Sequence, residues 1–144
     1  WDKNANSVSY AGANNPLWII RNRTIEEPER VKRKTDDTNS SLTLYEIAPD
    51  KMPIGFQLAH PPDFTTQKTT LHPNDLIILF TDGFADQFGG EKGKKFKYIA
   101  LRELLINMQS RSIAEHEQIL SAEFETWRGD HEQIDDVCLV GIRV

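Results

Sequence analysis

Alternating polar and apolar residues predict several short β-strands in the first half of the chain. Residues 7–12 and 42–47 alternate as half-buried strands do, and residues 64–72 are rich in β-branched side chains. The turn-forming residues 12–16 are followed at once by the apolar segment 17–21. We therefore expect residues 7–21 to form a β-hairpin.

The most hydrophobic run of the chain predicts a fully buried strand over residues 75–81. Five apolar residues stand in a row there, and turn residues precede them at 72–75. In contrast, residues 22–41 are charged and have no sustained apolar period, which is typical of a mobile loop with a solvated surface. Residues 48–57 are interpreted as a second loop, with a tight turn at 53–55.

The hydrophobic period then changes from 2 to 3.6, which predicts two amphipathic helices, at 96–109 and 112–128. Ser112 and Glu115 have the spacing of a capping box, and Gly129 stands where a helix would end. A strand over 134–144 is expected to follow. The expected core stripes are Ile99, Leu101, Leu104, Leu105 and Met108 in the first helix and Ile113, Leu120, Phe124 and Trp127 in the second.

Composition indicates one globular domain of 144 residues, 38% hydrophobic and 27% charged. The net charge of -5 argues against nucleic acid or an anionic membrane as the main partner.

No segment approaches the roughly 20 apolar residues of a membrane helix. The single cysteine, Cys138, excludes an internal disulfide and suits a reducing compartment. Because the first residue is Trp1, we expect the chain to be a piece of a longer protein.

Acidic residues stand at the ends of two predicted buried strands. Asp82 follows the first strand, and Asp135 and Asp136 begin the last one. If these strands are antiparallel neighbours, the carboxylates meet at one edge of the sheet, where their mutual repulsion requires a compensating charge. Hard divalent cations prefer such oxygen ligands. Asp86 lies about one helical turn after Asp82, and Gly83 allows a close backbone approach.

Simpler interpretations of these acids remain open. An Asp-Gly pair after a strand is often only a turn, Asp135 can cap a chain reversal, and Asp86 can be solvated. Cys138 is expected in mid-strand as a small hydrophobic residue and is a poor ligand candidate.

The four histidines, at positions 60, 72, 116 and 131, lack ligand spacing and are interpreted as surface or capping residues. No serine has the context of a nucleophile elbow. The Gly-Lys segment 89–95 is interpreted as a flexible loop that could help to hold an anionic substrate.

Four segments taken together resemble the C-terminal half of SpoIIE/RsbU-type serine phosphatases, which belong to the metal-dependent protein phosphatase 2C superfamily. In chain order they are YAGANNPLWIIR, KMPIG, LHPNDLIILFTDGFADQFGG and IDDVCLVGIRV. The resemblance covers nearly the whole chain. It implies an α+β fold, part of an α-β-β-α sandwich of mostly antiparallel sheets with two helices in the C-terminal half. It also implies a two-metal Mn²⁺ or Mg²⁺ centre that hydrolyses phosphoserine or phosphothreonine.

The resemblance assigns roles to individual residues. Asp82 matches the metal-bridging aspartate of the family's TDG motif, and Asp135 matches the C-terminal metal ligand. Asp86 matches an acidic position that some relatives link to a third, weaker metal. Asp136 and Gly83 match supporting positions without clear ligation. No catalytic residue beyond the metal ligands is implied.

One family motif is absent from this sequence. The Asp-containing stretch that ends in Gly-His-Gly, which supplies further metal ligands in the family, does not occur. We therefore expect residues 1–144 to hold half of a metal centre, to bind divalent ions weakly or not at all, and to have negligible activity alone. A sandwich cut through its sheets also exposes strand edges, which predicts a dimer or larger assembly.

Alternatives of other classes are a non-catalytic, phosphatase-like interaction domain and a Ca²⁺-binding module. The family resemblance implies a phosphoprotein partner, such as an anti-sigma-factor antagonist in bacterial signalling, and no nucleic acid. It implies a cytoplasmic location for this segment, without direct membrane insertion, and leaves open a membrane tether in an upstream sensor region.

Overall fold

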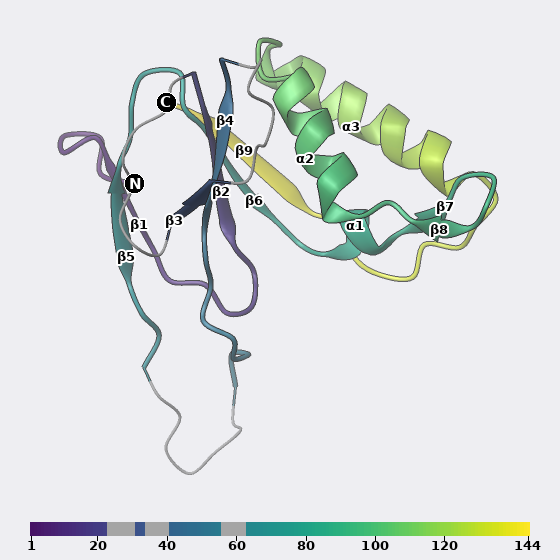
Figure 1. The fold of residues 1–144 in the computed structure, drawn as a ribbon, viewed down its shortest axis with the longest axis horizontal. Coiled ribbons are helices and arrows are strands. Elements are labelled where there is room, and N and C mark those ends of the chain that lie inside the picture. The colour runs from purple at the N-terminus through teal and green to yellow at the C-terminus, as the bar shows by residue number, and fades with distance from the viewer. Residues whose placement is uncertain (23–30, 34–40, 56–62) are drawn as a thin grey trace.

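The computed structural model describes residues 1–22, 31–33, 41–55 and 63–144. Its elements form three layers, as Figure 1 shows: a two-stranded sheet, a five-stranded sheet and a layer of helices. A short separate hairpin lies at the far end of the helical layer. This arrangement confirms the expected α+β fold with antiparallel sheets.

In chain order the elements are β1 (Ser7–Tyr10), β2 (Leu17–Arg21), β3 (Val31–Arg33), β4 (Thr43–Ile47), β5 (Gln67–Thr70), β6 (Leu76–Phe80), α1 (Gly83–Asp86), β7 (Phe88–Gly89), β8 (Lys94–Lys95), α2 (Tyr98–Asn107), α3 (Ile113–Arg128) and β9 (Leu139–Arg143). The small sheet pairs β1 with β5, and the large sheet has the order β3-β4-β2-β6-β9.

The predicted hairpin over residues 7–21 is wrong. β1 pairs with β5, whereas β2 pairs with β4 and β6. Pairing at both edges places β2 inside the large sheet, and all five of its residues are buried because both faces of the sheet are covered there. The turn over 12–16 therefore leads the chain from one sheet to the other.

Two further strand predictions differ from the structure. The segment 22–41 is not a loop throughout, because β3 pairs with β4; residues 23–30 and 34–40 lie outside the described part. The last strand begins at Leu139 rather than at residue 134, although it pairs with β6 as expected. Within the described residues, no helix is long and apolar enough to cross a membrane.

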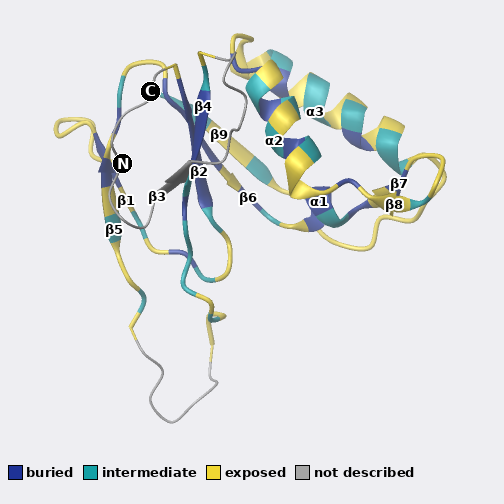
Figure 2. Cartoon of the chain, viewed as in Figure 1, coloured by how far each residue is buried: buried dark blue, intermediate teal, exposed yellow. Residues whose placement is uncertain are grey.

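The large sheet is buried on both faces, as Figure 2 shows by the buried residues along β2 and β4. One cluster fills the space between the two sheets: Val8, Leu17, Ile19, Tyr45, Ile47, Leu71 and Ile77. The other packs the large sheet against the helices and includes Trp18, Ile20, Leu44, Leu76, Ile78, Phe80, Phe84, Phe96, Leu101, Leu105 and Phe124. Burial of these side chains is the main force that holds the strands in register.

Both predicted helices are present, and a short helix, α1, adds a third. The expected stripes are buried at their centres, but Ile99 and Ile113 near the two helix starts are 61% and 41% exposed. Gly129 ends α3 with φ +53°, as its position predicts. The capping box of Ser112 and Glu115 is confirmed in both directions.

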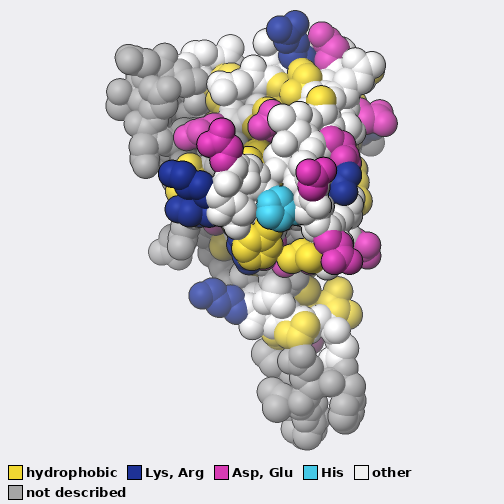
Figure 3. All heavy atoms as spheres, turned by 90° about the vertical axis from the view of Figure 1, so that its right-hand side faces the viewer, with side chains coloured by type: hydrophobic (Ala, Val, Ile, Leu, Met, Phe, Trp, Pro, Cys, Tyr) yellow, Lys and Arg dark blue, Asp and Glu magenta, His cyan; other side chains and the backbone are white. Residues whose placement is uncertain are grey.

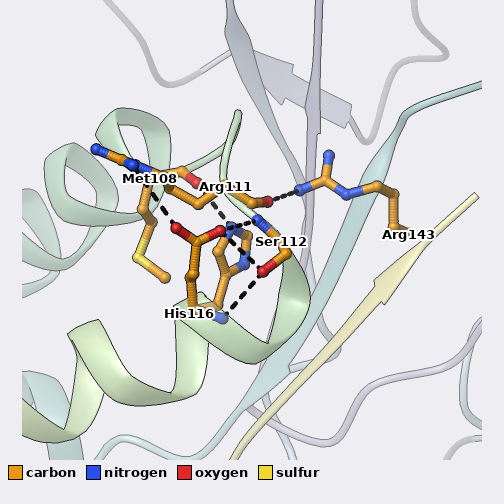
Figure 4. Close-up of polar contacts among 6 residues, drawn as sticks. Met108, Arg111, Ser112, His116 and Arg143 are labelled. Atoms are coloured by element: carbon orange, nitrogen blue, oxygen red, sulfur yellow. Dashed lines mark hydrogen bonds and ion pairs between the residues drawn. The ribbon is translucent and has the colours of Figure 1, made fainter.

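The turn between α2 and α3 is held by polar contacts, shown in Figure 4. Arg143 at the end of β9 donates to the carbonyl oxygens of Gln109 and Arg111 at 2.6 and 3.1 Å. His116, expected as a surface or capping residue, is buried, and its Nε2 atom lies 2.7 Å from the carbonyl oxygen of Met108, the C-cap residue of α2. These bonds fix the helical layer to the end of the large sheet.

Candidate functional site

The end of β6 and the segment before β9 lie side by side at one edge of the large sheet. The strands are antiparallel neighbours, with Phe80 opposite Leu139. Thr81 continues the pairing: its amide donates to the Cys138 carbonyl at 3.0 Å. Its hydroxyl donates to the Asp136 carbonyl at 2.7 Å and accepts from the Cys138 amide at 2.9 Å. The residues that follow Thr81 in the sequence and those that precede Cys138 therefore lie close together at the ends of the two strands.

Gly83 permits this close approach. A Cβ atom at this position would lie 2.4 Å from the Asp136 carbonyl oxygen, a distance that no side-chain carbon tolerates. Gly83 also begins α1, whose preceding residue is Asp82. The glycine thus lets the Asp82 turn lie against the backbone of Asp136, and its supporting role at a metal site stays a prediction.

The carboxylates at this edge are exposed and only loosely organised. Asp82, Asp135 and Asp136 are all exposed. The Asp135 side chain accepts from the Asp136 amide at 2.7 Å. Asp86, at the end of α1, forms an ion pair with Lys95, with Nζ and Oδ2 2.9 Å apart. The cation beside Asp86 in this structure is therefore a lysine of the chain itself.

These donors fit a hard divalent cation in kind but not in number. Carboxylate and carbonyl oxygens are the ligands that Mg²⁺ and Mn²⁺ prefer. Across residues 1–22, 31–33, 41–55 and 63–144, however, no group of three or more His, Cys, Asp or Glu side chains could hold a metal ion. The ligand roles of Asp82, Asp135 and Asp86 stay predictions.

Tyr98 is a site residue that the sequence patterns do not indicate. Burial raises the pKa of the Tyr98 hydroxyl, and the negative charges of Asp82, Asp86 and Glu46 raise this pKa further. Glu46 accepts a hydrogen bond from the Trp18 indole at 3.1 Å. The strand order β4-β2-β6 brings Glu46 into this group from a distant part of the sequence, so no local motif could reveal it.

Replacing Asp82 with asparagine is expected to lower the pKa of Tyr98. A nearby negative charge favours the neutral phenol, so its removal makes deprotonation easier. The measurement is an NMR titration of the tyrosine ring carbons. Tyr10 is the internal control, because burial alone raises its pKa. An unchanged Tyr98 midpoint in Asp82→Asn would show that Asp82 does not face this hydroxyl.

Other predictions near the site have mixed outcomes. Cys138 is exposed and lies just before β9, so its expected burial in mid-strand is wrong. His131 is exposed, in agreement with its surface assignment. His60 lies outside the described residues.

Comparisons with known proteins agree with this architecture. The model of the family "Stage II sporulation protein E (SpoIIE)" matches residues 2–144. Among solved structures, the chain is similar to the SiaA-PP2C domain of Pseudomonas aeruginosa, with a TM-score of 0.76 and 23% identity. The match covers 99% of this chain and 48% of that one, so the chain spans about half the length of that structure. No sequence among the curated proteins matches.

Proposed function

Because the chain belongs to the stage II sporulation protein E (SpoIIE) family, we propose that it forms the C-terminal part of a metal-dependent protein serine/threonine phosphatase domain. The observation that carries this proposal is the junction of β6 and β9. It places the Asp82 turn against the backbone of Asp136, with Thr81 and Gly83 as the close contacts. The fold shared with a PP2C domain supports it.

In this proposal Asp82 and Asp135 are the metal ligands that the chain contributes, and Asp86 is a weaker position. A bound Mn²⁺ or Mg²⁺ pair would supply the activated water and neutralise phosphoryl oxygens. The chain's own part is to hold the carboxylates at a fixed sheet edge. Asp136 contributes the carbonyl that accepts from Thr81 and thereby orients the turn. Lys95 holds Asp86 in place through their ion pair.

The substrate that we propose is a phosphoserine or phosphothreonine on a regulatory protein, such as an anti-sigma-factor antagonist. The proposed metal pair supports this substrate class, because two divalent cations neutralise the oxygens of a phosphoryl group.

The test is release of phosphate from a phosphoserine protein by the protein that contains this chain. We expect release in the presence of Mn²⁺ and its loss with EDTA. Residues 1–144 alone are expected to show negligible release, because they lack three converging ligands in the described part. Metal-independent release, or none under any condition, would contradict the proposal and favour a non-catalytic interaction domain.

A further inference from the structure

A lysine-rich hairpin lies beside the candidate site. Lys92, Lys94 and Lys95 lie in the β7–β8 hairpin, and Lys97 follows it directly before α2. These four lysines, all exposed, fall within six residues of a chain whose net charge is -5. Figure 3 looks onto the end of the molecule where this hairpin lies and shows basic and acidic side chains close to one another. Exposed lysines on an acidic protein can attract an anionic partner and steer its approach.

The hairpin is fixed to the rest of the fold by its backbone. The Lys97 amide donates to the Ala85 carbonyl at 2.7 Å, and the Gly90 amide donates to the Trp127 carbonyl at 2.8 Å. Lys97 has φ +77°, which is uncommon for a lysine and is maintained here by its bond to Ala85. Because the backbone is already ordered, binding a partner at these lysines costs little backbone conformational entropy.

One lysine connects the hairpin to the candidate site. Lys95 pairs with Asp86 at 2.9 Å, and Asp86 ends α1, the four-residue helix that follows Asp82. A helix of this length spans about 6 Å. Lys95, and with it this end of the hairpin, therefore lies about one helical turn from the Asp82 turn.

We propose that Lys92, Lys94 and Lys97 bind acidic residues that flank the phosphorylated side chain of a protein substrate. The substrate class rests on the proposed function. Lys95 keeps its ion pair with Asp86 and does not take part directly. The hairpin thus selects phosphorylation sites in acidic surroundings and holds them at the sheet edge.

The test measures the affinity of the protein that contains this chain for a fluorescein-labelled phosphoserine peptide with flanking acidic residues. The readout is fluorescence anisotropy in the absence of metal. The variant Lys92→Glu/Lys94→Glu/Lys97→Glu is expected to bind about tenfold more weakly, since each exposed charge pair contributes modestly. The control Lys3→Glu/Lys51→Glu/Lys68→Glu makes the same change in net charge with exposed lysines outside the hairpin. It is expected to change the affinity less than about twofold, because screening weakens distant charges.

Each outcome decides the inference separately from the proposed function, because the assay needs no turnover. Equal losses of peptide affinity in the two variants would mean that only net charge matters. Unchanged affinity in both variants would mean that the hairpin does not recognise the peptide. Either result overturns the proposal. Binding to phosphatidylserine vesicles but not to the peptide would also overturn it. A loss of peptide affinity in the hairpin variant alone, in a protein without phosphatase activity, would support the docking surface and contradict the proposed enzymatic function.

Discussion

If the proposed function holds, Asp82→Asn in the protein that contains this chain is expected to lower kcat by about a thousandfold or more, because the loss of a proposed metal ligand would remove several kcal/mol of transition-state stabilisation. The substitution keeps the size of the side chain and removes its charge. Asp82 is exposed, and its side chain makes no capping hydrogen bond to α1. The fold is therefore expected to stay intact. The measurement is Mn²⁺-dependent release of phosphate from a phosphoserine protein.

Asp136→Asn is the matched control for this prediction. Asp136 is equally exposed, but its contact with the site is through its carbonyl oxygen, which the substitution leaves in place. We expect kcat to fall by less than about tenfold. If both variants keep full activity, the sheet edge is not the reaction site. Equal losses of activity in both variants would contradict the inference that the Asp82 side chain binds metal and the Asp136 side chain does not.

The second large effect is on stability: Asp75→Ala is expected to lower the free energy of unfolding by about 3–5 kcal/mol. Arg21 Nη2 and Asp75 Oδ2 are 2.8 Å apart, and both side chains are 1% exposed. The same Asp75 oxygen accepts from the His72 amide at 2.8 Å. Removing the carboxylate takes a counter-ion away from a buried guanidinium, which is far more costly than losing a surface pair.

Urea unfolding measures this effect, and Glu125→Ala is the matched control. Glu125 also pairs with an arginine, Arg128, but its side chain is 61% exposed. Its removal is expected to cost less than about 1 kcal/mol, because solvent screens the pair. Similar losses in the two variants would contradict the view that the Arg21–Asp75 pair is buried.

The sequence predicts local elements well and their long-range pairing less well. The period of 3.6 residues and the Ser112–Glu115 spacing indicate α3, because these signals depend only on neighbours along the chain. The partner of β1 could not be found in this way, since β5 lies about 60 residues further on, as in the pair of Ser7 with Thr70. The tight turn next to β1 favoured the wrong hairpin.

At the candidate site, too, the sequence predicts some features and misses those that depend on the whole fold. Acids at the ends of two apolar strands predicted that Asp82 and the 135–136 segment would meet, and the pairing of β6 with β9 places them at one edge. Tyr98 carries no recognisable motif, because the acids around it come from α1, from the residue before α1 and from β4. Lys95 lies in the Gly-Lys segment that the sequence indicates, but its pairing with Asp86 depends on the fold. The expected dimer or larger assembly stays a prediction.

The most direct test of the central claim is Mn²⁺-induced broadening of the backbone amide signals of residues 1–144, which detects even weak metal binding. We expect broadening in two separate stretches, around residues 81–86 and 134–138, and its loss from both in Asp82→Asn. Broadening confined to one stretch, or centred elsewhere in the chain, would contradict the inference that these two segments form one cation site.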